Sequence, residues 1–196
     1  MDINTNQNPL YPVFFRLDKL RLLIVGAGAV GEEKLSFILK SSPNARIKVV
    51  ATWAGKGVQN LMDQYPEQVY LVQRAFSNED AQDADIVIAA TNMADINYTV
   101  YTAAKQYGKI VNVADTPDLC DFYMGSIVTR GDLKVAISTN GKSPTFAKRF
   151  RQLLEEILPE EVHDLVNNLK IVRDRLKGDF DHKVKELNRI TATLIQ

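Results

Sequence analysis

Three glycines with the spacing of a phosphate-binding turn are the first residues in this chain that indicate a chemical role. The stretch LRLLIVGAGAVGEEK places Gly26, Gly28 and Gly31 after an apolar run and before a helical pattern. The first glycine allows the sharp bend, the second lets the backbone approach a pyrophosphate, and the third allows close packing of helix on strand. The N–H groups that open the helix then face the anion. The sequence predicts a dinucleotide site, and the alternative is a tight strand-to-helix turn without a ligand.

The residues expected near the ribose of such a ligand include no acid. The second predicted strand ends near VVATWAGKG, where an aspartate or glutamate normally binds the ribose hydroxyls. Thr52 can bond a ribose hydroxyl instead, and Trp53 can either stack on adenine or cover the edge of the sheet. No arginine adjoins them in the sequence to neutralise a 2′-phosphate, although Lys56 is close. The pattern favours NAD over NADP.

A carboxylate follows the last predicted strand of the same region. In GKIVNVAD, Asp115 comes at the carboxyl end of a strand, where ligands of open α/β sheets bind. A carboxylate there can accept a proton or orient a substrate. The sequence DTPD, with Pro117, is equally typical of an ordinary turn, and both interpretations stay open. Cys120 has no histidine near it in the sequence, so we expect it to be structural or incidental.

The segment STNGKSPTFAKRFRQ is a polar loop that leads into a helix. Ser143 can cap that helix, and Pro144 suits its first position. The N-terminus of the helix and the basic residues around it can bind an anion; these residues are Lys142, Lys148, Arg149 and Arg151. The alternative is a solvated helix face.

Alternating strand and helix patterns predict the framework that positions these residues. Apolar runs predict strands at residues 20–26, 45–51, 69–73, 84–91 and 108–114, and helical spacing predicts helices at residues 29–40 and about 95–107. This alternation is typical of an α/β, Rossmann-type fold with a parallel sheet and right-handed crossovers. We expect an NAD-binding domain at residues 1–113, which begins with a loose polar arm at residues 1–12.

The pattern changes after Asp115. Residues 125–139 contain two alternating runs joined at Arg130-Gly131-Asp132, which predicts an antiparallel hairpin. We interpret the triplet as a turn rather than an adhesion signal. Three helical patterns follow. The first ends at Pro159, and the other two carry apolar stripes that end at Leu176 and Leu194. The stripe of the first pattern consists of Phe146, Phe150, Leu153, Leu154 and Ile157.

The composition limits the partners and the compartment. Lys and Arg number 24 and so do Asp and Glu, so the formal net charge of zero gives no general attraction to nucleic acid or to an anionic membrane. The single cysteine favours a reducing compartment. The N-terminal stretch does not resemble a signal peptide and no apolar run has the length of a membrane span, so we expect a cytoplasmic protein. His163 and His182 stand apart, and we expect no metal site.

Taken in order, these segments resemble a known family. The order of three stretches is similar to the precorrin-2 dehydrogenase / sirohydrochlorin ferrochelatase family, the dehydrogenase module of siroheme synthase. These stretches are YPVFFRLDKLRLLIVGAGAVGEEK, then IAATN…N, then VNVADTPDLCDFYMGSIVTRGDLKVAISTNGKSPTFAKRFR. The resemblance covers about residues 9–159. Residues 112–151 carry most of its specificity, because a generic Rossmann domain has no reason to contain them.

The resemblance implies an activity and a set of site residues. Members of the family oxidise precorrin-2 to sirohydrochlorin with NAD⁺, and some also insert Fe²⁺ to give siroheme. The essential aspartate of the family corresponds to Asp115. The residues expected to bind NAD are Gly26, Gly28, Ala29, Val30, Gly31, Thr52, Trp53 and Thr91. Those expected to bind the tetrapyrrole are Asn112, Thr139, Lys142, Ser143, Lys148 and Arg149.

The resemblance also implies a homodimer. Residues 114–143 would form its dimerisation segment, and a helical tail at residues 144–196 would contribute to the substrate cleft. Two other functions remain alternatives at this point. One is a dehydrogenase that never inserts iron. The other is an NAD(H)-sensing module without catalysis, which explains the glycine turn equally well and residues 112–151 less well.

Overall fold

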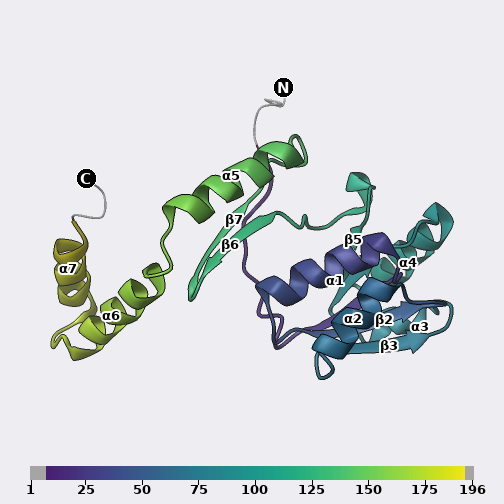
Figure 1. Cartoon of the computed structure of the whole chain (residues 1–196), viewed down its shortest axis with the longest axis horizontal. Coiled ribbons are helices and arrows are strands. Elements are labelled where there is room, and N and C mark those ends of the chain that lie inside the picture. Colours follow the sequence, from purple (N-terminus) through teal and green to yellow (C-terminus); the bar gives the residue numbers. More distant parts are fainter. Residues whose placement is uncertain (1–7, 193–196) are drawn as a thin grey trace. The chain divides into compact units, whose positions relative to one another are not determined.

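The structure is a computed structural model that describes residues 8–192 and divides them into two compact units. The first unit contains residues 8–124 together with Asn140–Lys142, and the second contains Gly125–Thr139 and residues 143–192. Both are coloured along the sequence in Figure 1. The predicted stripe residue Leu194 and the first seven residues of the predicted arm lie outside the described residues.

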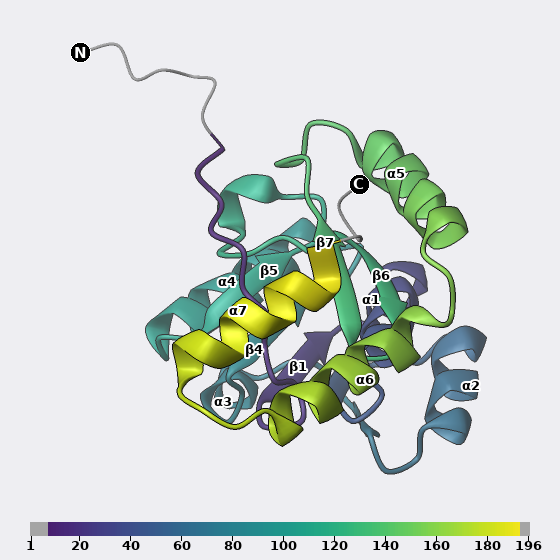
Figure 2. The ribbon, with the colours of Figure 1, turned by 90° about the vertical axis from the view of Figure 1, so that its left-hand side faces the viewer.

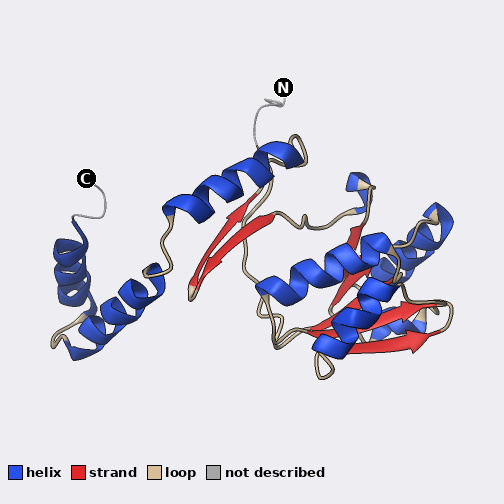
Figure 3. Ribbon diagram, in the orientation of Figure 1, coloured by secondary structure: helices blue, strands red, loops and turns tan. Residues whose placement is uncertain are grey.

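A parallel sheet of five strands forms the centre of the first unit. The strands, drawn in red in Figure 3, are β1 (Arg21–Val25), β2 (Arg46–Ala51), β3 (Val69–Gln73), β4 (Ile86–Ala89) and β5 (Ile110–Val113). Their order in the sheet is β3-β2-β1-β4-β5. The prediction of a Rossmann-type sheet is confirmed. The chain order reverses between β1 and β4, and in open α/β sheets this switch point is where ligands bind.

Helices cover both faces of this sheet. The first face is covered by α1 (Ala29–Ser41) and α2 (Lys56–Gln64), and the second by α3 (Glu79–Gln82) and α4 (Ala94–Gln106) (Figure 1). The sequence patterns predicted α1 and α4 but missed α2 and α3. The physical reason is that α3 is too short to show a period and α2 buries a single residue, Val58.

The first unit extends beyond the boundary expected at Val113, because the chain returns to the sheet after β5. A short 3₁₀ turn, Pro117–Leu119, follows the strand. The N–H of Asp121 then donates to the carbonyl of Val111 at 2.8 Å, and its carboxylate accepts from the N–H of Val111 at 2.9 Å and from Lys105 at 2.8 Å. Phe122 and Met124 pack against the core.

The second unit begins with an antiparallel hairpin of β6 (Ser126–Arg130) and β7 (Leu133–Ile137), as predicted. Arg130 pairs with Leu133, so Gly131 and Asp132 form the turn, and Gly131 has a φ of 56°. The guanidinium of Arg130 donates to the carbonyls of Leu158 at 3.0 Å and Glu155 at 2.7 Å. Arg130 is therefore bound to the end of the following helix, which agrees with the interpretation of the triplet as a turn.

Three helices follow the hairpin: α5 (Pro144–Ile157), α6 (Val162–Arg175) and α7 (Phe180–Thr191) (Figure 2). The Oγ of Ser143 accepts from the N–H of Phe146 at 3.2 Å, so the predicted cap is confirmed. No helix within residues 8–192 has the length and apolar character needed to cross a membrane.

The hairpin covers only part of the predicted apolar stripe of α5. Ala147 and Leu154 pack against Val128 and Ile137 of the hairpin. The other members of the predicted stripe remain exposed; they are Phe146, Phe150, Leu153 and Ile157. The spacing of apolar residues correctly indicated a helix, but it could not indicate which of two adjacent apolar faces the hairpin covers.

Candidate functional site

A cavity of about 460 Å³ opens at the carboxyl ends of β1, β2 and β4. The strands bring to it residues that are distant in the sequence, because parallel strands end at the same edge of a sheet. All residues predicted to bind the cofactor line this cavity except Gly31; they are Gly26, Gly28, Ala29, Val30, Thr52, Trp53 and Thr91. The lining is mostly apolar, as in many ligand pockets.

The three glycines of the turn serve two different purposes. A methyl group at Gly26 would place its carbon 2.5 Å from the carbonyl oxygen of Ala90, and one at Gly31 would place it 2.2 Å from the carbonyl oxygen of Gly26. Both glycines are therefore required by packing. At Gly28 a methyl group would meet only the ring of Trp53, at 3.8 Å, and the φ of −84° is ordinary. The fold does not need glycine there, but close approach of a pyrophosphate to the backbone does.

The helix that follows the turn presents an N-terminus to the cavity. Gly28 is the N-cap of α1 and has no side chain that could cap it, while Ala29 and Val30 of the first turn line the cavity. Free N–H groups and the positive end of the helix dipole at such a position favour an anion. Together with the space at Gly28, this arrangement fits a dinucleotide pyrophosphate.

Trp53 lies across the mouth of the glycine turn. Its side chain is exposed, and its ring lies next to both Gly28 and Gly55. The N–H of Gly55 donates to the carbonyl of Ala27 at 2.9 Å, which ties the segment after β2 to the turn after β1. The backbone next to Trp53 is therefore held by a hydrogen bond while the indole stays accessible to solvent, as stacking on an adenine requires.

Thr91 is held in place by Asn97, which was not among the residues predicted to bind the cofactor. Asn97 of α4 is buried, and its Oδ1 accepts from the N–H of Thr91 at 3.1 Å and from its hydroxyl at 2.7 Å. The amide nitrogen of Asn97 donates to the carbonyl of Thr91 at 3.1 Å. The second asparagine of TNMADIN was the available signal. This network fixes the loop that forms the β4 side of the cavity.

The structure also corrects the expectation that no arginine lies near the ribose position. Arg74 follows β3, which pairs with β2, and it is among the residues that line the same cavity as Thr52 and Trp53. Sequence adjacency to the end of β2 was the wrong criterion, because the neighbouring strand supplies the residue. Phe76, Asn92, Met93 and Ile96 also line the cavity and were not predicted.

Asp115 lies at the predicted edge of the sheet but outside the cavity lining. It comes two residues after β5, whose Val113 pairs with Ala89, and the N–H of Ala114 donates to the carbonyl of Ala89 at 2.9 Å. Asp115 is exposed and has a φ of 57°. Left-handed conformations are uncommon except for glycine, asparagine and aspartate. The carboxylate is thus available to a ligand one strand away from the β4 side of the cavity.

The side chain of Asn112 is used inside the protein. It is buried, and its amide nitrogen donates to the carbonyl of Phe122 at 2.8 Å and to the Sγ of Cys120 at 3.4 Å. Asn112 therefore supports the loop that carries Asp115, and we leave it out of the proposed substrate contacts.

The thiol of Cys120 occupies the inside of the same loop. It donates to the carbonyl of Val113 at 3.2 Å and accepts from the N–H of Val113 at 3.3 Å. Burial raises the pKa of the Cys120 thiol, which disfavours the thiolate that a nucleophile requires. These contacts agree with a structural role for Cys120.

The predicted anion-binding loop leads into α5. The hydroxyl of Thr139 accepts from the N–H of Ser143 at 3.0 Å, and Asn140 and Gly141 both have positive φ values, of 54° and 75°. Lys142 is exposed in this loop, and Lys148 and Arg149 are exposed on α5. Thr139 and Ser143 thus shape the backbone at the helix N-terminus, while the three cations remain open to solvent.

Two sequence families match the chain. Residues 13–126 match the family described as "Putative NAD(P)-binding", and residues 130–157 match the one described as "Sirohaem biosynthesis protein central". The first match covers more than half of the chain and includes every residue that lines the cavity.

The chain is also similar to individual proteins. It is 35% identical over 172 residues to the siroheme synthase of Nitrosomonas europaea, and the aligned region covers 88% of this chain and 36% of that protein. It is 35% identical over 175 residues to the siroheme synthase of Pseudoalteromonas atlantica, and this aligned region covers 89% of this chain and 37% of that protein. The chain therefore spans little more than a third of these relatives. The resemblance found in the sequence is confirmed.

A solved structure shares the fold. SirC, precorrin-2 dehydrogenase, matches with a TM-score of 0.75 and 23% sequence identity, over 92% of this chain and 89% of that one. The match includes the parallel sheet, the hairpin and helices after it, so the predicted succession of elements is confirmed.

Proposed function

The chain belongs to this NAD(P)-binding family, and from that premise we propose that it oxidises precorrin-2 to sirohydrochlorin with NAD⁺ bound in the 460 Å³ cavity. The names of its relatives, siroheme synthase and precorrin-2 dehydrogenase, support this substrate. The observation that carries the proposal is the glycine at position 28. The fold would accept a side chain there, whereas the close approach of a pyrophosphate requires its absence.

The reaction removes a hydride and a proton from the macrocycle, and we assign the proton to Asp115. Bound NAD⁺ supplies the hydride acceptor. An exposed carboxylate at the carboxyl edge of the sheet can accept the proton, and general bases of this kind contribute about 10²–10⁴-fold to a rate. The left-handed backbone at Asp115 fixes the direction in which the side chain leaves the loop.

The substrate is a polycarboxylate, and we propose that the basic residues around the start of α5 bind it. The chain as a whole is neutral, so recognition of a polyanion needs a local concentration of positive charge. Lys142, Lys148 and Arg149 are exposed cations, and the N-terminus of α5 adds further N–H donors. In this proposal Thr139 and Ser143 act by shaping that N-terminus.

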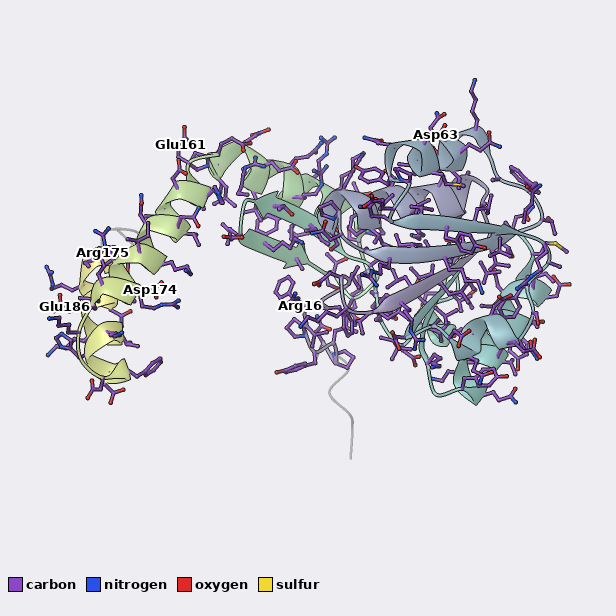
Figure 4. All side chains as sticks on the ribbon, turned by 90° about the horizontal axis from the view of Figure 1, so that it is seen from below. Arg16, Asp63, Glu161, Asp174, Arg175 and Glu186 are labelled. Carbon is purple, nitrogen blue, oxygen red and sulfur yellow. The ribbon has the colours of Figure 1, made fainter. Side chains whose placement is uncertain are left out.

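We propose a homodimer formed through the segment expected at residues 114–143 together with α5, the helix that directly follows it. Phe146 and Phe150 of α5 stack with their ring centroids 5.9 Å apart, although both are exposed. Leu153 and Ile157 continue this apolar stripe, and neither α6 nor α7 buries a residue within the described chain. The charged residues at the ends of α6, Glu161, Asp174 and Arg175, extend away from the ribbon in Figure 4. A second copy of the stripe is the natural cover for it, because a symmetric dimer joins identical patches.

Iron enters the proposal as a second substrate. Some members of the family that the sequence resembles also insert Fe²⁺, and we extend this activity to the chain, with Asp115 as acceptor of the pyrrole protons. We place both reactions in the cytoplasm, where the single thiol of Cys120 would remain reduced.

The experiment that tests the proposal is a pair of assays on the purified chain. Precorrin-2 with NAD⁺ should give NADH and the absorbance spectrum of sirohydrochlorin together. Sirohydrochlorin with Fe²⁺ and no NAD⁺ should give siroheme faster than the spontaneous reaction. NAD⁺ binding without any NADH formation would favour the NAD(H)-sensing alternative, and an unchanged metallation rate would remove iron insertion alone.

A further inference from the structure

The residues that line the cavity include one of a charged type. Within residues 8–192 this is Arg74, and the other lining residues are neutral. Arg74 lies at the adenosine end, because it follows β3, and Gln73 of that strand pairs with Ala51 and donates through Nε2 to the carbonyl of Thr52 at 3.4 Å. A dinucleotide that lies with its pyrophosphate at Gly28 and its adenine at Trp53 would place its ribose near Thr52 and Arg74.

Resting on the proposed function, we propose that Arg74 forms a binding site for the 2′-phosphate of NADP, so that the cavity accepts NADP⁺ in addition to NAD⁺. An acidic residue at the end of β2 would bind the ribose diol and repel a phosphate. The chain has Thr52 at this position, and no carboxylate lines the described cavity. The acidic residue that usually excludes NADP is absent, and an arginine is among the lining residues.

The geometry of Arg74 holds its guanidinium ready for a second anion. Its Nη1 donates to the Oδ2 of Asp80 at 2.6 Å and to the carbonyl of Ala75 at 2.9 Å, and its Nη2 donates to the Oδ1 of Asp80 at 2.7 Å. These bonds use three of the five N–H donors of an arginine. The remaining Nε–H and one N–H of Nη2 can bind phosphate oxygens, and the side chain is 46% exposed.

The negative charge of Asp80 does not fully neutralise Arg74, because a second cation shares the same carboxylate. Lys48 also contacts the Oδ1 of Asp80, at 2.6 Å, so two cations share one buried carboxylate. Glu79 is the other acid that faces this group. It is exposed, accepts from the hydroxyl of Ser77 and does not line the cavity. Asp80 therefore positions the guanidinium, as a fixed partner does for a bidentate arginine site.

Two pairs of ligands that differ only in the 2′-phosphate test this inference. Isothermal titration calorimetry on the full chain would compare NAD⁺ with NADP⁺, and adenosine 5′-monophosphate with adenosine 2′,5′-bisphosphate. We expect the ligand with the 2′-phosphate to bind at least as tightly as its partner in both pairs. Its Kd should also rise more steeply with salt concentration, because it carries the additional contact between charges.

Arg74→Gln should raise the Kd of the ligands with the 2′-phosphate by about tenfold or more, as expected for the loss of one charge-assisted contact. The Kd of the ligands without it should change less than about threefold. Arg46 is an exposed arginine at the start of β2 and outside the cavity lining. Arg46→Gln is therefore the matched control and should leave the Kd values of both ligand pairs unchanged. If NAD⁺ binds and NADP⁺ is rejected or is insensitive to Arg74, the inference is wrong. If NAD⁺ itself does not bind, the proposed function fails instead. Should Arg74→Gln not fold, equal salt dependence for the two ligands of each pair would overturn the inference.

Discussion

Alanine substitutions at Gly28 and Gly31 should affect different properties, ligand binding at the first and stability at the second. Alanine at Gly28 fits the backbone and meets only ordinary contact with Trp53, whereas alanine at Gly31 would collide with the carbonyl of Gly26. We expect Gly28→Ala to lower the affinity for NAD⁺ about tenfold or more with little change in the midpoint of thermal unfolding. Gly31→Ala should lower the unfolding free energy by about 1–3 kcal/mol. Calorimetry and urea denaturation measure the two effects. Equal loss of stability in both variants would contradict the separation.

Asp115 needs a substitution that respects its backbone. Alanine at a φ of 57° would add strain of about 1 kcal/mol, whereas asparagine tolerates the left-handed conformation and has the same shape as aspartate. We expect Asp115→Asn to retain NAD⁺ binding and thermal stability while kcat for precorrin-2 oxidation falls about 100-fold or more. Steady-state kinetics with full unfolding curves would check this. A variant that keeps the wild-type kcat would take the proton-accepting role away from Asp115.

At the scale of elements, the connection from β3 to α3 depends on Asp80. Burial alone raises the pKa of Asp80, but hydrogen bonds from Arg74, Lys48 and the N–H of Ser77 outweigh it and hold the pKa well below its usual range. A carboxyl with a lowered folded-state pKa stabilises the fold above the unfolded pKa of about 3.9 and loses this contribution as the pH falls below it. We expect Asp80→Asn to cost about 3 kcal/mol at neutral pH.

The gap in unfolding free energy between wild type and Asp80→Asn should therefore shrink as the pH falls below about 4. Urea denaturation at a series of pH values measures this gap. Asp83→Asn changes a neighbouring exposed aspartate and should give a curve parallel to that of the wild type. A gap for Asp80→Asn that stays constant down to strongly acidic pH would rule out the carboxylate as the source of the stability.

The same elements mark how far the sequence could predict the structure. Strands, the glycine turn and the cap at Ser143 were predictable because each depends on residues close together in the chain. The bonds from Asn97 to Thr91 and the presence of Arg74 and Thr52 in one cavity lining depend on how β2, β3, β4 and α4 assemble, which no local pattern encodes. The buried position of Asn112 was unpredictable for a related reason, since a polar residue next to a catalytic candidate can equally be a buried support.

For the whole molecule, the exposed stripe on α5 predicts the assembly state. Phe146 and Ile157 are each 60% exposed, so a charge in the stripe would not disturb the packing of α5 on its hairpin, which uses Ala147 and Leu154. We expect Phe150→Glu to raise the dissociation constant of the proposed dimer about 100-fold or more, since it would bury an unpaired charge in an apolar interface. Sedimentation velocity across a range of concentrations measures this shift.

Thr145→Glu provides the matched control, because it places the same carboxylate on an exposed position of α5 outside the stripe. Its sedimentation should equal that of the wild type, and the circular dichroism of both variants should show intact helices. Precorrin-2 oxidation then links assembly to activity. If the two copies complete one substrate site, Phe150→Glu loses turnover at dilutions where the wild type remains a dimer, yet keeps its affinity for NAD⁺, whose cavity lies wholly within the first unit. A wild-type chain that sediments as a monomer at all concentrations would refute the dimer.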